Sequence, residues 1–255
     1  MAINVNTVYT TVLSILNKEQ RGYLTPFEFN QLGTQVQLEI FESYFENLNQ
    51  LLKVPQPDSD YADRVKLLQE KISFFGKNQI ITVTNSTPIA QQESFGKATI
   101  PTTLHRFGML EYINGHSLPV DVEKLTRNQV LSYRRSPLTS PTKEFPICFV
   151  QGDTIFILPA IPSTVGPEHK PIQSYNLEFV GKPIDPVWNY TVGSVGQYIF
   201  DPIANGVSKD FEISDIDQTE LITKILMYAG VVVRDQEIVQ AAAGLSNQQD
   251  QLELS

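Results

Sequence analysis

Residues 25–52, TPFEFNQLGTQVQLEIFESYFENLNQLL, contain the pattern that decides the fold. Their first turn carries a helix start signal, because Thr25 can cap a helix, Pro26 suits the first helical position and Glu28 completes a Thr-x-x-Glu capping box. Apolar side chains then recur at steps of three or four, the spacing of one helix face: Phe29, Leu32, Val36, Ile40, Tyr44, Leu48 and Leu51. The pattern predicts a long amphipathic helix over residues 26–52.

The same spacing predicts further helices on both sides of this one. The apolar residues before it are Val5, Val8, Val12, Ile15 and Leu16, and those after Pro55 and Pro57 are Tyr61, Val65, Leu68, Ile72 and Phe75. Near the C-terminus, Asp217 can cap a helix whose apolar face runs from Leu221 to Tyr228, with Gly230 after it. The sequence also predicts a second short helix over residues 234–243, with Gly244 beyond its end.

The middle of the chain has β character instead. Short β-prone runs lie at 80–84, 108–113, 118–122, 147–150, 154–158, 176–180 and 198–200, with Pro and Gly between them. Gln151-Gly152-Asp153 is typical of a hairpin turn, and residues 125–133 are a candidate short helix. The sequence predicts an α+β fold. Its three regions are a helical N-terminal region (1–77), a β-rich body with long loops (78–215), and C-terminal helices with a polar tail (216–255).

Composition and charge exclude several classes of protein. The chain is 41% hydrophobic, and its net charge of −9 argues against a general nucleic-acid binder, which needs a basic face. The one cysteine, Cys148, cannot form a disulfide within the chain. The N-terminus lacks the basic and apolar regions of a signal peptide, and no run nears the ~20 apolar residues of a membrane span. We therefore expect a soluble protein made in the cytoplasm.

The sequence carries no recognisable catalytic or metal-binding motif. His105, His116 and His169 lack a metal-ligand spacing, and no phosphate-binding Gly-rich loop occurs. Two groups of carboxylates could serve a glycosidase or a nuclease: Asp58, Asp60 and Asp63, and Asp210, Glu212, Asp215 and Asp217. Both groups sit at expected helix starts, where acidic side chains complement the helix dipole. We expect no enzyme activity, no cofactor and no metal.

Two short segments are candidates for contacts between subunits. Arg134 and Arg135 precede a stiff stretch with prolines, residues 136–141, and could pair with acidic groups of a neighbour. A solvated loop charge is the alternative. Trp188 and Tyr190 end a Pro-bracketed aromatic cluster that suits an interface anchor and suits a local core equally well.

Several segments resemble one family in their order and spacing. They are VYTTVL (8–13), NKEQRGYLTPFEFN (17–30), QLEIFESYF (37–45), YRRSP (133–137) with Pro141 and Pro146, EFVGKPIDPVW (178–188) and ILMYAGVVVRDQEIVQ (225–240). Together they span nearly the whole chain and are similar to virion structural proteins of crAss-like and related short-tailed bacteriophages. The family is structural and brings no catalytic residues.

The resemblance implies a subunit of the head–tail connector or of a tail ring, located in the virion and made in the bacterial host. It implies a closed homo-oligomeric ring, dodecameric by analogy, below the portal. Its partners would be the portal or adjacent tail ring proteins. Genomic DNA would pass the ring during ejection without sequence-specific binding. A portal adaptor and a more distal ring both stay open.

A tail-associated glycan-binding module without catalysis is the alternative function. Such a module needs a cleft that combines exposed aromatic rings with a carboxylate. Trp188, Tyr190 and Tyr198 with a nearby acid are the residues to inspect. A hydrolase with an unrecognised site is a third option, which the lack of a nucleophile paired with a base disfavours.

Overall fold

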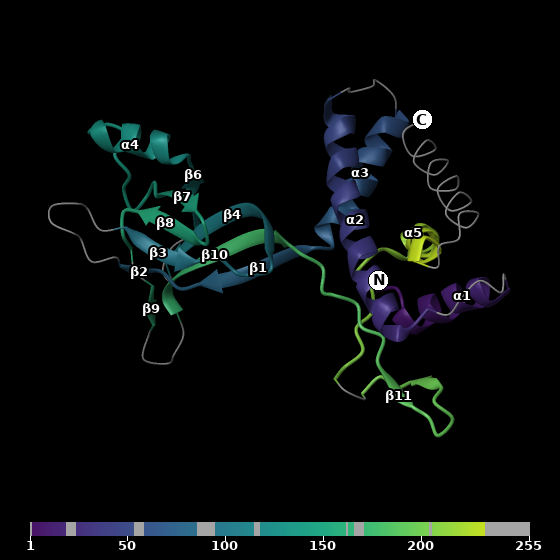
Figure 1. Ribbon diagram of the computed structural model, residues 1–255. Coiled ribbons are helices and arrows are strands. Elements are labelled where there is room, and N and C mark those ends of the chain that lie inside the picture. The colour runs from purple at the N-terminus through teal and green to yellow at the C-terminus, as the bar shows by residue number, and fades with distance from the viewer. Residues whose placement is uncertain are drawn as a thin grey trace. The chain divides into compact units, whose positions relative to one another are not determined.

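The computed structural model describes residues 2–18, 24–53, 59–85, 95–114, 118–161, 163–165, 171–203 and 206–232. The chain divides into two compact units. Figure 1 shows their helices and strands, coloured from the N-terminus to the C-terminus of the chain. The helical unit is Met1–Phe74 with Pro183–Ser255, and the sheet unit is Phe75–Lys182. The fold is α+β, with helices at both ends of a β-rich centre, as the sequence predicts.

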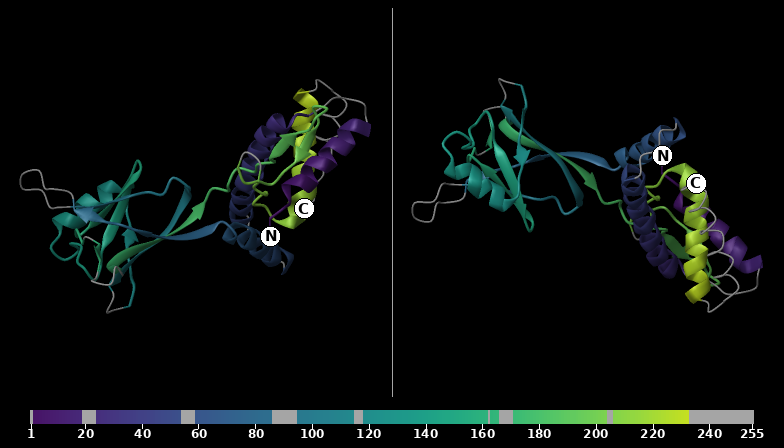
Figure 2. Two further views of the ribbon diagram at one scale, coloured as in Figure 1. Left: turned by 90° about the horizontal axis from the view of Figure 1, so that it is seen from below. Right: turned by 90° about the horizontal axis from the view of Figure 1, so that it is seen from above.

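The helical unit contains four α-helices in the part of the chain that the structure describes. Its elements are α1 (Val5–Lys18), α2 (Pro26–Lys53), α3 (Ser59–Ser73), β11 (Tyr190–Val192), β12 (Tyr198–Phe200), the 3-10 helix η1 (Asp215–Asp217) and α5 (Gln218–Val232). Figure 2 shows α1, α2 and α5 within this unit. The long helix over 26–52 is confirmed, whereas the helix expected at 234–243 lies outside the described residues. No described helix is long and apolar enough to cross a membrane.

The capping box at the start of α2 is present as the sequence predicts. Glu28 Oε2 accepts hydrogen bonds from the Thr25 backbone N–H at 3.0 Å and from the Thr25 hydroxyl at 2.7 Å. The Glu28 N–H donates to Thr25 Oγ1 at 3.3 Å. These bonds satisfy amide groups that the first turn of a helix leaves without partners. They fix the residue at which the longest helix begins.

The apolar faces of the helices meet in one core. Its fully buried members include Val8, Val12 and Leu16 of α1, Phe29, Val36, Ile40 and Phe41 of α2, and Leu221, Ile225 and Ala229 of α5, together with Phe211 and Ile213. Gly33 allows one close approach, because a Cβ at this position would lie 3.2 Å from the Phe211 ring. The spacing that predicts α2 from the sequence therefore also determines which of its faces is buried.

Residues 183–215 belong to the helical unit, although the sequence groups them with the β-rich body. Side chains of α2 bind their backbone. Gln37 is buried, and its Nε2 donates to the Ile184 carbonyl at 2.8 Å while its Oε1 accepts from the Glu212 N–H at 3.0 Å. Asn30 Oδ1 accepts from the Trp188 N–H at 2.8 Å. Side-chain amides of α2 thus hydrogen-bond the backbone of this segment, whereas a β-rich body would bind it by strand pairing.

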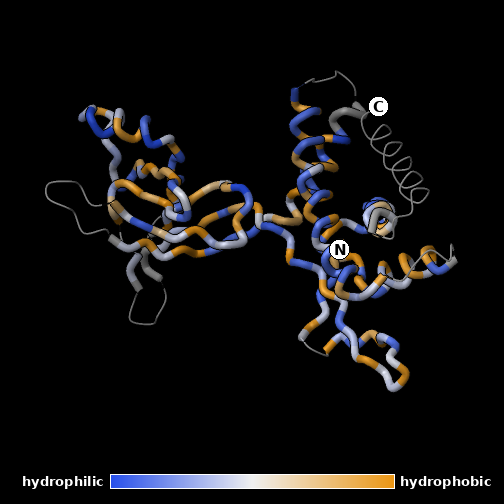
Figure 3. The backbone as a smooth tube through the Cα atoms, in the orientation of Figure 1, coloured by the Kyte–Doolittle hydropathy of each residue, from blue (hydrophilic) through white to orange (hydrophobic). Residues whose placement is uncertain are grey.

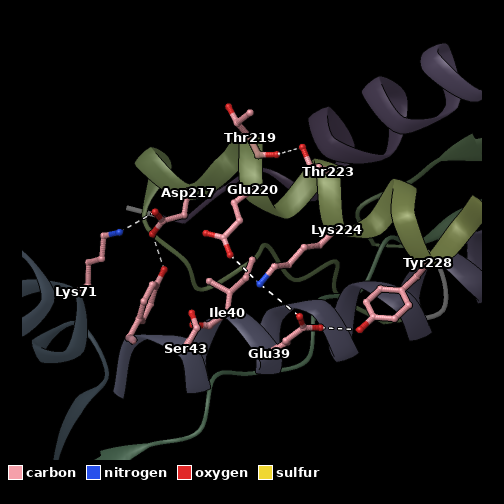
Figure 4. A network of polar contacts seen from close by, with 11 residues as sticks. Glu39, Ile40, Ser43, Lys71, Asp217, Thr219, Glu220, Thr223, Lys224 and Tyr228 are labelled. Carbon is pink, nitrogen blue, oxygen red and sulfur yellow. Dashed lines mark hydrogen bonds and ion pairs between the residues drawn. The ribbon is translucent and has the colours of Figure 1, made fainter. Parts of the chain in front are cut away.

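A buried polar network fixes α3 and α5 on α2 (Figure 4). Asp217 accepts hydrogen bonds from Tyr44 Oη at 2.5 Å and from Lys71 Nζ at 2.8 Å. Lys224 Nζ lies 2.9 Å from Glu220 Oε1 and 3.4 Å from Glu39 Oε1, and Tyr228 donates to Glu39 at 2.8 Å. The sequence suggested Asp217 as a cap of the last helix, but the structure gives its carboxylate to α2 and α3 instead.

In its described residues, the sheet unit contains two five-stranded sheets. The first has the order β1 (Gly76–Ile81), β10 (Pro171–Gly181), β4 (Leu104–Asn114) and β5 (Val120–Asp121), with β9 (Thr164–Val165) beside β10. The second has the order β2 (Thr84–Asn85), β3 (Gly96–Thr99), β8 (Thr154–Leu158), β7 (Ile147–Gln151) and β6 (Glu123–Lys124). The predicted hairpin turn is confirmed between β7 and β8, where Gly152 has a φ of 57°.

The core of the sheet unit contains residues from both sheets. Leu110, Tyr175 and Leu177 come from the first sheet, and Cys148, Ile155 and Ile157 come from the second. Hydrophobic and hydrophilic positions are interspersed along this unit in Figure 3, and burial alternates along β3, where Gly96 and Ala98 are buried and Lys97 and Thr99 are exposed. The predicted short helix is α4 (Arg127–Arg135), and its Val130 packs with Ile147, Phe149 and Leu158 of the second sheet.

We expect Glu28→Gln to reduce the loss of thermal stability that occurs when the pH falls from 7 to about 3. The hydrogen bonds from the Thr25 side chain and backbone lower the pKa of Glu28 below its usual 4.5. A lowered pKa in the folded state means that this stabilisation is present above pH 4.5 and is lost as the pH falls through the folded-state value. Thermal melts between about pH 3 and pH 7 should show a steeper acid loss for the wild type. Parallel profiles would contradict the capping role.

We expect Asp217→Ala to lower the free energy of unfolding by about 3–5 kcal/mol, because it leaves a buried lysine unpaired. Lys71 is the residue affected, with only 9% of its side chain exposed. Asp63→Ala is the matched control. It breaks the surface pair with Lys66, whose side chains are 72% and 79% exposed, and should cost less than about 1 kcal/mol. Urea unfolding followed by circular dichroism measures both losses, and equal losses would refute the prediction.

Candidate functional site

Helix α4 carries both arginines that the sequence singles out. The helix starts with a polar cap, since Gln129 Oε1 accepts from the Thr126 N–H at 2.8 Å and from the Thr126 hydroxyl at 2.7 Å. Arg134 is half-buried, and its guanidinium lies 5.2 Å from the centroid of the Phe95 ring. Arg135 is exposed. The two neighbours therefore have different surroundings, which their adjacency in the sequence does not indicate.

A pocket of ≈ 460 Å³ lies between α4 and the second sheet. Its lining comprises Phe95, Arg127, Val130, Leu131, Arg134, Phe149, Gln151 and Phe156. The rings of Phe149 and Phe156 are stacked, with centroids 4.9 Å apart. Arg127 Nη1 donates to Gln151 Oε1 at 3.3 Å. The pocket thus combines aromatic walls with two guanidinium groups.

Sequence reasoning identified only one residue of this pocket, Arg134. A usable signal was present, because Arg127 precedes Arg134 by seven residues and so lies on the same helix face. The aromatic walls could not be assigned without strand pairing. Phe149 and Phe156 are paired across β7 and β8, which places both on one face of the sheet. The pocket forms because α4 crosses that face of the sheet.

Trp188 is a core residue of the helical unit. It is 3% exposed, and its Nε1 donates to Asn6 Oδ1 at 3.0 Å. Its ring lies between other aromatic rings, 4.2 Å from Tyr9 and 5.8 Å from Tyr190 by centroid distance. Of the two sequence interpretations, interface anchor or local core, the structure has the local core. An exposed ring face, which a glycan binder needs, is not offered by Trp188.

Tyr190 connects this core to an exposed hairpin. Tyr190 is half-buried on β11 and contacts Tyr198 of β12 edge to face at 4.8 Å. Val192 is paired with Tyr198 at the end of the hairpin and Val195 lies in its turn, and their side chains are 63% and 88% exposed. We call these two residues the hairpin tip; Figure 3 shows apolar positions on this hairpin. The tip turns at Gly196, whose φ of 85° is a conformation that L side chains rarely adopt.

The second carboxylate group of the sequence does not form one site. Asp210 accepts from the Val5 N–H at 2.9 Å at the start of α1, and Glu212 accepts from the Ile184 N–H at 2.9 Å. Asp217 serves the buried network described above. In the other group, Asp63 pairs with Lys66 at 3.9 Å, and the side chains of Asp58 and Asp60 lie outside the described residues. Asp210, Glu212 and Asp217 therefore have separate structural partners rather than a shared substrate position, and Asp215 is exposed.

The remaining candidates from the sequence are Cys148 and the three histidines. Burial raises the pKa of the Cys148 thiol to about 12, so it carries no thiolate at neutral pH. His105 lies on β4, whereas His116 and His169 lie outside the described residues. No group of three or more His, Cys, Asp or Glu side chains that could hold a metal ion occurs among the described residues.

No protein-family model matches the sequence, and no curated protein is significantly similar to it. Among the described residues, the pocket under α4 and the hairpin tip are two surface features that bear on function.

The fluorescence of Trp188 tests its placement, because the chain has one Trp. We expect blue-shifted emission and weak quenching by acrylamide in the native protein, since the indole is buried and stacked. Unfolding in guanidinium should shift the emission to the red and increase quenching by acrylamide. Oligosaccharides should leave the native spectrum unchanged. Strong native quenching, or a saturable change on adding a glycan, would contradict the core placement.

Proposed function

We propose that the chain is a structural subunit of a ring in the head–tail connector or tail of a short-tailed bacteriophage. The ring assembles below the portal in the virion from copies made in the host cytoplasm, and it surrounds part of the DNA passage without reading sequence. The partners are further copies of the chain in a closed ring, dodecameric by analogy with the resembling family, and the portal or an adjacent tail ring protein. The sequence resemblance supports this proposal.

The structural observation that supports it best is the exposed hairpin tip. Val192 and Val195 of the tip are 63% and 88% exposed, and Ile203 and Val207, in the segment that follows β12, are 78% and 73% exposed. Soluble monomers leave single apolar residues exposed, but a group of them marks a surface that another protein covers. The tip lies at the end of a β-hairpin whose base is held by the stacking of Tyr190 on the buried Trp188.

A second exposed apolar group lies in the sheet unit. Leu138 and Phe145, in the loop that follows α4, are 94% and 75% exposed. A ring of identical subunits requires two different complementary patches on each subunit, because its contacts are heterologous. The two units supply unlike surfaces of this kind. Permanent contacts in such assemblies bury on the order of 2,000 Å² or more.

The proposal includes no enzyme activity. Its support is that Asp210, Glu212 and Asp217 each bind a backbone amide or a buried partner. The Cys148 thiol is buried and has a raised pKa. Groups committed to folding contacts in this way are not available as an acid, a base or a nucleophile.

Native mass spectrometry and negative-stain microscopy test this function. We expect the purified protein to form closed rings of one stoichiometry, and Val195→Asp to weaken assembly at least tenfold, because a buried unpaired carboxylate opposes association. Thr10→Asp is the control, since it adds the same charge at an exposed polar position on α1. A wild-type protein that stays monomeric and is absent from virions would refute the proposal.

A further inference from the structure

Charge is divided unequally between the two units. The sheet unit contains 10 Lys and Arg residues against 8 Asp and Glu, and the helical unit contains 9 against 20. Their net charges are therefore +2 and −11, which together give the −9 of the chain. Two copies of this chain attract one another when the sheet unit of one copy faces the helical unit of the other.

The positive charge of the sheet unit is concentrated on α4. This helix, RNQVLSYRR, contains three arginines and no acidic residue. Arg135 in its last turn complements the helix dipole, but Arg127 at its first position opposes the dipole. A cation at the N-terminus of a helix is locally unfavourable, and such unfavourable residues are expected at functional sites. Arg127 lines the pocket under α4, which gives the pocket a cationic edge.

The pocket has the chemistry to accept an apolar segment from an acidic surface. Its walls are the rings of Phe95, Phe149 and Phe156, and its volume of ≈ 460 Å³ exceeds that of a single aliphatic side chain. The hairpin tip matches these walls, because residues 190–200 contain no charged side chain. Burying the tip therefore removes apolar surface from water and desolvates no charge.

We propose that the pocket under α4 binds the hairpin tip of a second copy of this chain, so that the acidic unit that carries the tip meets the cationic edge of the pocket at Arg127. The inference rests on the ring proposed above and specifies its contact. The pocket and the tip belong to different units, so each copy uses its pocket toward one neighbour and its tip toward the other. This contact is heterologous, as a cyclic assembly requires.

Charge reversal on α4 tests the pocket half of the contact. Arg127→Glu should weaken assembly at least tenfold in sedimentation velocity, because it places like charge against the acidic unit. The substitution suits the helix N-terminus, so α4 should remain folded, as circular dichroism can verify. Arg135→Glu is the matched control: it makes the same charge change on the same helix but at a position that does not line the pocket. Equal weakening by both variants would overturn the proposal.

Mixing two defective variants tests the pairing of pocket and tip. Arg127→Glu keeps an intact tip, and Val195→Asp keeps an intact pocket. Neither should assemble alone, but an equimolar mixture should form dimers, since one complete contact remains between the two variants. A mixture that stays monomeric while the wild type forms rings would show that the two patches do not bind each other.

Single-stranded DNA is the alternative ligand to test, because aromatic rings and arginines also bind nucleic acid. In fluorescence anisotropy, we expect a labelled oligothymidine to behave the same with the wild type as with Arg127→Glu. Binding lost in this variant, with ring assembly unchanged, would assign the pocket to DNA and overturn the inference. Rings that persist in Arg127→Glu refute this contact but leave the ring function intact, whereas a monomeric wild type refutes both.

Discussion

Asp217 is the group on which the arrangement of the helical unit depends. Its carboxylate receives hydrogen bonds from Tyr44 on α2 and Lys71 on α3, and it lies immediately before α5. Buried charges are tolerated only when they are paired, so α3 and α5 can take few positions along α2 other than the one that completes these bonds. The second ionic group, around Lys224, adds a further constraint on α5. Burial alone would lower the pKa of Lys224, but Glu220 and Glu39 raise it, so the lysine stays charged.

The same logic holds the segment that carries the hairpin. The segment 183–217 is held by side-chain amides of α1 and α2. Gln37 and Asn30 of α2 bind its backbone, and Asn6 of α1 binds the Trp188 indole. Gln37 is buried and both ends of its amide are hydrogen-bonded, which avoids the cost of unpaired polar atoms. The consequence for function is that the apolar hairpin tip extends from a fixed aromatic base.

The elements with strong local signals could be predicted from the sequence. The capping box and apolar spacing predicted α2, and the hairpin at Gly152 and helix α4 were also predicted correctly, because caps, turns and periodicity act within a few residues. The sequence did not predict β3 or the place of residues 183–215. It assigned Asp217 to a helix cap and left Trp188 between two interpretations. These outcomes depend on partners distant in the chain, such as Tyr44 for Asp217 and Asn6 for Trp188.

Sequence by itself determined the α+β class, the helices at both ends of a β-rich centre, and the apolar face of α2. It also contained the charge difference between the units, although the unit boundaries were needed to reveal it. Only the tertiary structure decided how β10 pairs with β1 and β4, and how α4 covers Phe149 and Phe156 to make a pocket. The physical reason is distance along the chain: periodicity and capping act over a few residues, whereas sheet pairing and buried ion pairs join residues that only the folded core brings together.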